Sequence, residues 1–279
     1  MDKDTITILE RIHAAYYQFT AAERKVADFV LAQHDQVQFM SISQLAEECG
    51  TAEATISRFC RTLELKGFNA FKIELARDHV AAPVHHDLDT PQGRSKNVGK
   101  LSSEAISQTI DLVEIPRVLQ AVELLEKAPR VICIGSGGSM IIASECAHLF
   151  STVTGKFFAV SDSHSQMSAV ATLGKNDVII LFSYSGATTN GIQVLELAKQ
   201  LGIPTILVTR FSKSPAAKLA DVVLRCGSNE SPFQFGSVPA KVAQLVVIDI
   251  LFQEYCYRNR DACEQNIQRI ASALSVKHI

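Results

Sequence analysis

The chain has 279 residues, of which 47% are hydrophobic and 20% are charged, and its formal net charge is −2. At about 100–200 residues per domain, this length allows one large domain or two ordinary ones, each with its own core. The composition excludes collagen-like, low-complexity and wholly disordered chains. The near-balance of charge argues against a protein that coats nucleic acid through bulk charge, but it allows a localised DNA-reading patch.

The seven cysteines are an odd number, and none forms a Cys-x-x-Cys pair or lies in a cluster with histidines. This spacing argues against a zinc site and a disulfide framework, and it favours reduced thiols in the cytosol. The N-terminal segment is charged from its second residue and lacks the apolar core of a signal peptide. No run of about 18 apolar residues occurs, so we expect a soluble, cytoplasmic protein without a membrane partner.

Helical patterns fill residues 1–80. Thr20 and Glu23 form a capping box before the apolar residues of one helix, and Ser41 with Gln44 can open a second. Gly50 ends that helix, and Thr51 can cap a third. The third helix places Ile56, Phe59, Cys60 and Leu63 on one face. No segment here alternates with period two, so the sequence predicts an all-α domain.

The third predicted helix carries a polar and basic face. Thr55, Arg58, Arg61 and Thr62 lie opposite its apolar face, and further lysines follow. A short helix, a glycine-containing turn and a helix with such a face are typical of the helix-turn-helix motif. A generic surface helix is the alternative.

Residues 81–100 are rich in Pro, Gly, Asp and Ser at their start, which predicts a linker. A helical pattern resumes near Leu101 and runs to Lys127, with a possible break at Pro116. Beyond Pro129, five nearly continuous apolar runs alternate with stretches of helical length. They are Val131–Ile134, Phe157–Val160, Val178–Phe182, Thr205–Val208 and Val222–Leu224. Residues 101–279 are therefore predicted to form an α/β doubly wound, flavodoxin-like domain with a five-stranded parallel sheet.

Two turns rich in serine and glycine follow the first and third of these strands. Gly135-Ser-Gly-Gly-Ser139 and Ser183-Tyr-Ser-Gly-Ala-Thr188 each lead into a helix. Ligands of open α/β sheets bind at the carboxyl ends of the strands. Hydroxyls and helix N-termini make a cradle for a phosphomonoester. Turns that only cap helices are the alternative.

Two further residues are candidates for the same site. His164 follows the second strand, where it could bind the hydroxyls of a sugar or lie exposed in a loop. Lys241 is near the start of a long apolar helix, where its charge opposes the helix dipole. An anion would compensate that charge, whereas a solvated lysine is the alternative.

The first turn is neither a dinucleotide fingerprint nor a P-loop. Met140 stands where the fingerprint requires its last glycine, and no Gly-Lys-Ser/Thr follows. A nucleotide-dependent dehydrogenase is therefore disfavoured, and we expect neither a cofactor nor a metal.

Several motifs together resemble one family. Residues 43–50, 51–61 and 66–72 look like the helix-turn-helix domain of RpiR-type transcriptional regulators, and residues 20–28 fit its opening helix. The two serine-glycine turns resemble the phosphosugar motifs of the sugar isomerase (SIS) domain. The resemblance covers nearly the whole chain and implies a homodimer or higher homo-oligomer that binds operator DNA and a phosphosugar effector.

The resemblance also implies the residues of two sites. The effector-binding residues expected are Gly135, Ser136, Gly137, Ser139, His164, Ser183, Ser185, Thr188 and Lys241. In a helix-turn-helix docked on a pseudo-palindromic operator, four residues would approach base edges, namely Thr51, Glu53, Thr55 and Ser57. Arg58 and Arg61 could reach bases or phosphates, and Lys66 and Lys72 would meet phosphates.

The resemblance favours a repressor of sugar catabolism genes, with N-acetylmannosamine 6-phosphate as the first effector to test. The alternative is a sugar-phosphate isomerase or lyase with an accessory helical domain. An isomerase needs a base, normally a carboxylate, to move a proton between carbons. SIS-type isomerases carry a glutamate just before the segment that ends in the lysine matched by Lys241. In this chain Gln234 stands there, and Glu230, four residues earlier, is the alternative base. Because an amide cannot accept the proton, we expect binding without turnover.

Overall fold

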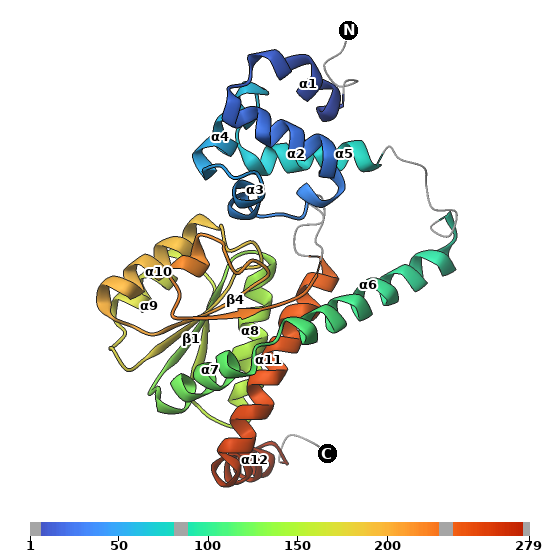
Figure 1. The fold of residues 1–279 in the computed structure, drawn as a ribbon. Coiled ribbons are helices and arrows are strands. Elements are labelled where there is room, and N and C mark those ends of the chain that lie inside the picture. The colour runs from blue at the N-terminus through green and yellow to red at the C-terminus, as the bar shows by residue number, and fades with distance from the viewer. Residues whose placement is uncertain (1–6, 81–88, 229–236, 276–279) are drawn as a thin grey trace. The chain divides into compact units, whose positions relative to one another are not determined.

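The computed structural model describes residues 7–80, 89–228 and 237–275 (Figure 1). The chain forms two compact units, with the boundary between Lys100 and Leu101. The first is helical, and the second is built on a parallel sheet. Within these residues, no helix is both long and apolar enough to cross a membrane.

Residues 7–80 form five helices and a short 3-10 turn. They are α1 (Ile8–Ala15), η2 (Tyr16–Gln18), α2 (Ala21–Val37), α3 (Ile42–Glu48), α4 (Glu53–Thr62) and α5 (Phe68–Val80). The predicted capping boxes are present at Thr20 on α2 and at Ser41 on α3, and Thr7 forms a third on α1. Each box satisfies amides that a helix start would otherwise leave unpaired.

The predicted apolar face of α4 is buried. Ile56, Phe59 and Cys60 are fully enclosed, and the Phe59 ring packs edge-on against Phe71 with 5.5 Å between ring centroids. The prediction that Thr51 caps α4 is wrong. Ala52 is the N-cap residue, and its methyl side chain cannot accept a hydrogen bond. Thr51 lies one residue earlier, in the turn after α3, where its amide donates to the carbonyl of Ala46.

The end of α4 requires a left-handed residue. Glu64 has a φ of 60°, and the amide of the next residue, Leu65, reaches back to the carbonyl of Cys60. This is the geometry in which helices usually end on glycine, since a Cβ is unfavourable there. Glu64 therefore holds a strained backbone at the end of α4.

The helical segment predicted from Leu101 to Lys127 begins earlier in the structure. Helix α6 spans Pro91–Leu112, so it starts ten residues before Leu101 and inside the predicted linker. Thr90 explains this start, because its hydroxyl accepts from the Gly93 amide and proline is favoured at the first helical position. After a break at Val113 and Glu114, α7 runs over Ile115–Lys127. The domain boundaries remain a prediction.

The five predicted strands form one parallel sheet in the order β2-β1-β3-β4-β5. They are β1 (Val131–Gly135), β2 (Phe157–Val160), β3 (Val178–Phe182), β4 (Thr205–Thr209) and β5 (Val222–Arg225). The helices and the 3-10 turn between and after them are α8 (Gly138–Ser151), α9 (Ser163–Ala171), α10 (Thr189–Leu201), η4 (Ala216–Lys218), α11 (Val238–Arg258) and α12 (Arg260–Ser275). The fold is thus the predicted doubly wound α/β domain.

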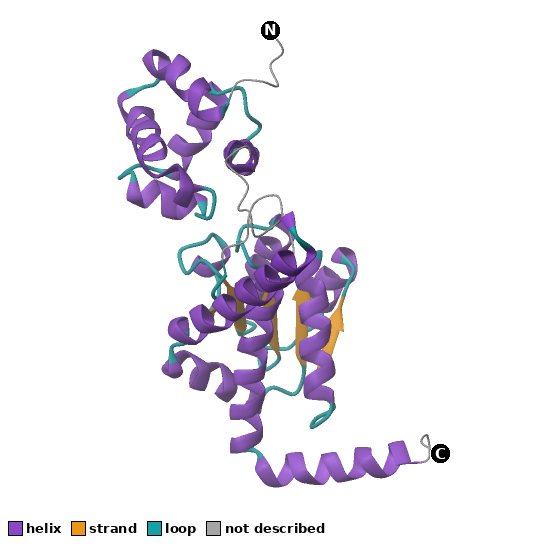
Figure 2. Ribbon diagram, turned by 90° about the vertical axis from the view of Figure 1, so that its right-hand side faces the viewer, coloured by secondary structure: helices purple, strands orange, loops and turns teal. Residues whose placement is uncertain are grey.

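Helices cover both faces of the sheet (Figure 2). One face packs on α7, α8 and α11 through residues such as Cys133, Ile180 and Val208, and the other packs on α9, α10 and η4. The strands are buried because each face has its own layer of helices. Strand β2 is an exception: it is an edge strand, and Phe158 remains 49% exposed.

An ion pair joins the amino ends of β1 and β3. Arg130 donates through Nη2 and Nε to the two carboxylate oxygens of Asp177, at 2.7 and 3.3 Å. The Asp177 carboxylate also accepts from the Gly174 amide at 2.7 Å and is 4% exposed. Burial alone would raise the pKa of Asp177, but the bonds from Arg130 and Gly174 outweigh burial and lower it.

We expect Glu64→Gly to stabilise the chain by about 1 kcal/mol, because glycine adopts positive φ without a Cβ penalty. Calorimetric unfolding of the full chain measures this. Glu64→Ala is the matched control, because it removes the carboxylate but keeps the Cβ. An equal gain for both variants would show that the side chain, and not the backbone, is responsible.

We expect Asp177→Asn to lower the free energy of unfolding by about 1.5–3 kcal/mol at neutral pH, because it removes a charge-assisted pair. The folded-state pKa of Asp177 is lowered, so its stabilisation is full above the unfolded pKa of about 4 and is lost as pH falls through the folded value. The difference in the free energy of unfolding between the variant and the unmodified chain should therefore become smaller below about pH 4, as measured by urea titrations. A deficit that persists unchanged in acid would contradict the assignment.

Candidate functional site

The candidate site lies where the strand order reverses. Strands β1 and β3 are neighbours, with Gly135 opposite Phe182, although β2 lies between them in sequence. Helices of the two halves pack on opposite faces of the sheet at this point. Ligands of open α/β sheets bind at the carboxyl ends of the strands at such a point. The two serine-glycine turns follow Gly135 and Phe182 directly, so they begin at the same level of adjacent strands.

The first turn needs its glycines for backbone reasons. A Cβ on Gly135 would lie 2.5 Å from the carbonyl oxygen of Ser139, so the strand could not pass this close to α8 with another residue. Gly137 has a φ of 56° and serves as the N-cap of α8 without a side-chain bond. Ser136 is exposed and Ser139 half-buried in the first turn of the helix. The turn thus presents hydroxyls beside the start of a helix, as predicted.

The second turn is tied to its neighbours. The Ser183 amide donates to Val208 of β4, and its hydroxyl lies 3.4 Å from that of Thr188, the N-cap of α10. The Ser185 hydroxyl accepts from the Ala187 amide at 3.2 Å. Gly186 has a φ of 60°, and a Cβ there would overlap the fully buried Ser214 side chain. The hydroxyls of this turn are therefore held in place by the packing of its backbone.

His164 and Lys241 each lie in the first turn of a helix, α9 and α11. His164 is exposed in the first turn of α9, which Asp162 caps by accepting from the Ser165 amide. That bond is the main cause that lowers the pKa of Asp162. Lys241 is half-buried in the first turn of α11, which Ser237 caps. Gln234 and Glu230, on which the isomerase argument depends, lie outside the described residues.

Gln166 was not identified from the sequence. Its side chain on α9 is 1% exposed, and its amide nitrogen donates to Gly135 at 2.9 Å and to Val160 at 2.8 Å. Its amide oxygen accepts from Asn190 of α10 at 2.6 Å. A glutamine within a short helix carries no sequence signal for such contacts, because the partners come from three other elements.

Tyr184 was also missed, although it stands in the middle of the second turn. Its hydroxyl donates to the carbonyl of Ser228 at 2.5 Å, and Arg210 donates to the same oxygen at 3.0 Å. Burying a carbonyl with two donors fixes the chain where it leaves β5. The aromatic residue between the two serines could have suggested a packing role.

Helix α4 exposes a narrower polar face than predicted. Arg58 and Arg61 are exposed and Ser57 is half-buried, as expected of residues that could reach DNA. Thr55 does not lie opposite the apolar face: it is 4% exposed, and its hydroxyl accepts from Arg58 at 3.2 Å. The helical period places residue 55 on the same side of the helix as buried Phe59, four positions later, so it could not lie opposite the apolar face.

Other candidates for DNA contact have partners within the unit. Glu53 accepts from the Ser43 hydroxyl at 2.7 Å and so joins α4 to α3. Lys72 donates to the carbonyl of Met40 at 3.3 Å, and its ammonium group lies 5.4 Å from the centre of the Phe68 ring. Lys66 is exposed, whereas Thr51 is half-buried. Glu53 thus joins α4 to α3, and Lys72 joins α5 to the residue before Ser41.

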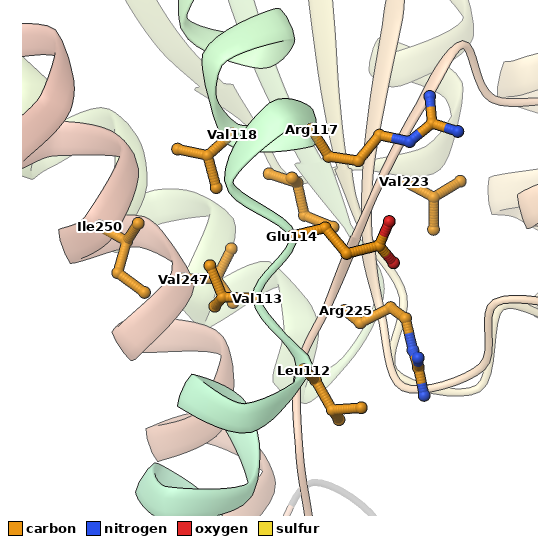
Figure 3. A pocket seen from close by; sticks show the side chains of 10 residues that line it. Leu112, Val113, Glu114, Arg117, Val118, Val223, Arg225, Val247 and Ile250 are labelled. Atoms are coloured by element: carbon orange, nitrogen blue, oxygen red, sulfur yellow. The ribbon is translucent and has the colours of Figure 1, made fainter.

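A small cavity lies apart from the candidate site, between the α6–α7 break, α11 and β5 (Figure 3). It holds only about 10 Å³. Arg117, Glu114 and Arg225 extend to one side of it, where they line a hollow of about 260 Å³ together with Asp221. Two arginines face two carboxylates there, so the hollow has no net charge to select an ion. Among the described residues, no three His, Cys, Asp or Glu gather as metal ligands would.

Comparison with known families assigns both units. The helix-turn-helix domain of the rpiR family matches residues 6–82, and the SIS domain matches residues 124–253. An uncharacterized HTH-type transcriptional regulator of Caldanaerobacter subterraneus subsp. tengcongensis is 31% identical over 99% of both chains. Another, YbbH of Bacillus subtilis, is 32% identical over 86% of this chain and 87% of its own.

A solved structure is similar over both units. The Vibrio vulnificus NanR protein complexed with ManNAc-6P superposes with a TM-score of 0.89 and 25% identity, covering 98% of this chain and 100% of that one. The order of the two domains, the serine-glycine turns at the switch point and the full-length relatives agree with one another. The chain therefore belongs to the RpiR family of HTH-type transcriptional regulators, with an N-terminal helix-turn-helix domain and a C-terminal SIS domain.

Proposed function

We propose that this regulator is a repressor of sugar catabolism genes and that a phosphosugar bound in the SIS domain controls it. The observation that carries the proposal is the meeting of two hydroxyl-rich turns at the β1–β3 switch point, in a chain that also has a helix-turn-helix domain. The effector we test first is N-acetylmannosamine 6-phosphate, because the similar NanR structure is a complex with that molecule.

The pocket chemistry suits a phosphomonoester. The hydroxyls of Ser139, Ser183, Ser185 and Thr188, and the amides at the starts of α8 and α10, would donate to the phosphate. Ser136 would also contact the phosphate or the sugar, and the glycines of the first turn, Gly135 and Gly137, would let the ligand approach the backbone. His164 would bind sugar hydroxyls, and Lys241 would supply a positive charge.

The DNA contacts that we propose centre on the exposed face of α4. Ser57, Arg58 and Arg61 would approach bases, while Lys66 would contact phosphates and position the domain. Thr55, which is buried, would act by holding the Arg58 side chain. A homodimer would place two such helices on half-sites about 10–10.5 bp apart or a multiple of that, on a pseudo-palindromic operator.

The effector assignment predicts that Ser183→Ala and Ser185→Ala each weaken binding of N-acetylmannosamine 6-phosphate by about 10- to 100-fold, because a hydrogen bond to a charged group contributes about 1.5–3 kcal/mol. Calorimetry measures the affinity. Ser272→Ala, on exposed α12, is the matched control and should bind like the unmodified chain.

Unchanged affinity in both serine variants would show that the turns do not hold the phosphate. In the same samples, NMR of N-acetylmannosamine 6-phosphate and of glucosamine 6-phosphate should show no product. Turnover would replace the proposed regulator with the alternative, a phosphosugar isomerase.

The proposed DNA contacts predict different effects for Arg58, which would contact bases, and Lys66, which would contact phosphates. On a fragment selected from random-sequence DNA, Arg58→Ala should reduce the preference for that fragment over unselected DNA. Lys66→Ala should weaken binding to both about equally and reduce the salt slope by about one. Lys127→Ala, an exposed lysine of the SIS domain, is the control. Loss of specificity in Lys66→Ala alone would reverse the assigned roles.

A further inference from the structure

The side chain of Gln166 connects three elements around the candidate pocket. Through the bonds described above, it reaches the last residue of β1, the last residue of β2 and the first turn of α10. Both amide hydrogens and the amide oxygen have partners, and the side chain is almost fully enclosed. A buried group whose polar atoms are all satisfied favours one arrangement of its neighbours.

The three partners are the points where the pocket begins. Gly135 opens the first serine-glycine turn, and Asn190 is the second residue after Thr188, which ends the second turn. Val160 leads into the segment that carries His164. Gln166 lies below these loops with only 1% exposure, so it can set their spacing without touching a ligand.

We propose that Gln166 is a positioning residue for the phosphosugar pocket. Its amide fixes the separation of the two serine-glycine turns, and effector affinity depends on that separation. This inference rests on the proposed function, because it concerns the same pocket.

An amide suits this position because the side chain donates to carbonyls and accepts from Asn190 at the same time. A glutamate carboxylate would set its negative charge against two carbonyl oxygens, so it should favour the protonated form. A protonated glutamate donates one bond and accepts another, and so restores part of the arrangement. Asp162 and His164 are the titratable residues of the same short segment. The groups bonded to Gln166 from β1, β2, α8 and α10 are uncharged.

The test compares affinity for N-acetylmannosamine 6-phosphate in the full chain and in Gln166→Leu, Gln166→Glu and Asn190→Ala. We expect Gln166→Leu to bind about tenfold more weakly and Asn190→Ala about threefold, the effect of losing one or more hydrogen bonds. The affinity of Gln166→Glu relative to the unmodified chain should fall as pH rises from about 5.5 to about 8.5, because its carboxyl ionises. Comparing the two proteins at each pH removes the effect of the titration of the phosphate, because both bind the same ligand.

Asp177→Asn is the control for stability, since it lies at the opposite end of the strands and should bind the phosphosugar normally. If Gln166→Leu fails to fold, Asn190→Ala and the pH profile of Gln166→Glu decide the question. Unchanged affinity in Asn190→Ala together with a flat relative profile would overturn the inference while the proposed function stands. The unmodified chain is also tested with N-acetylmannosamine 6-phosphate, N-acetylglucosamine 6-phosphate and glucose 6-phosphate. If it binds none of the three, the proposed function fails, and the inference fails with it.

Discussion

The parallel pairing of β1 with β3 is the constraint on which the candidate site depends. It places Gly135 and Phe182 side by side, so two turns that are 48 residues apart in sequence start at one level of the sheet. The helices that follow β1 and β3, α8 and α10, pack on opposite faces of the sheet. The Arg130–Asp177 pair supports the same two strands from their other end. The positions of the two turns at the carboxyl ends of β1 and β3 thus depend on contacts along the whole length of these strands.

The loops at this edge are held mainly by side chains that bond to backbone groups. Gln166 contacts the ends of β1 and β2, and Tyr184 and Arg210 both donate to the carbonyl of Ser228, in the segment after β5. Ser214 packs against Gly186 in the second turn. Loops that are already ordered lose little conformational entropy when a ligand binds, so more of the contact energy appears as affinity.

Much of the fold was predictable because its signals are local. The five strands are continuous apolar runs, and the capping boxes at Thr20 and Ser41 require residues only three positions apart. The misses have different causes. The first turns of α6 are almost entirely exposed and so lack apolar periodicity, and only Thr90 and Pro91 mark the start. The burial of Thr55 follows from the helical period of its own helix, so it could have been predicted. Gln166 owes its role to neighbours distant in sequence, which a single sequence does not reveal.

In the proposed pocket, the residues that hold the loops are different from the residue that would contact the sugar. Gln166 and Asn190 hold the loops from beneath, whereas His164 stands exposed on the first turn of α9. Substitutions at the exposed position leave the buried amide pair untouched. In the proposed pocket, a substitution at His164 can therefore change which sugar is recognised, while the two serine-glycine turns and the buried amide pair stay as they are.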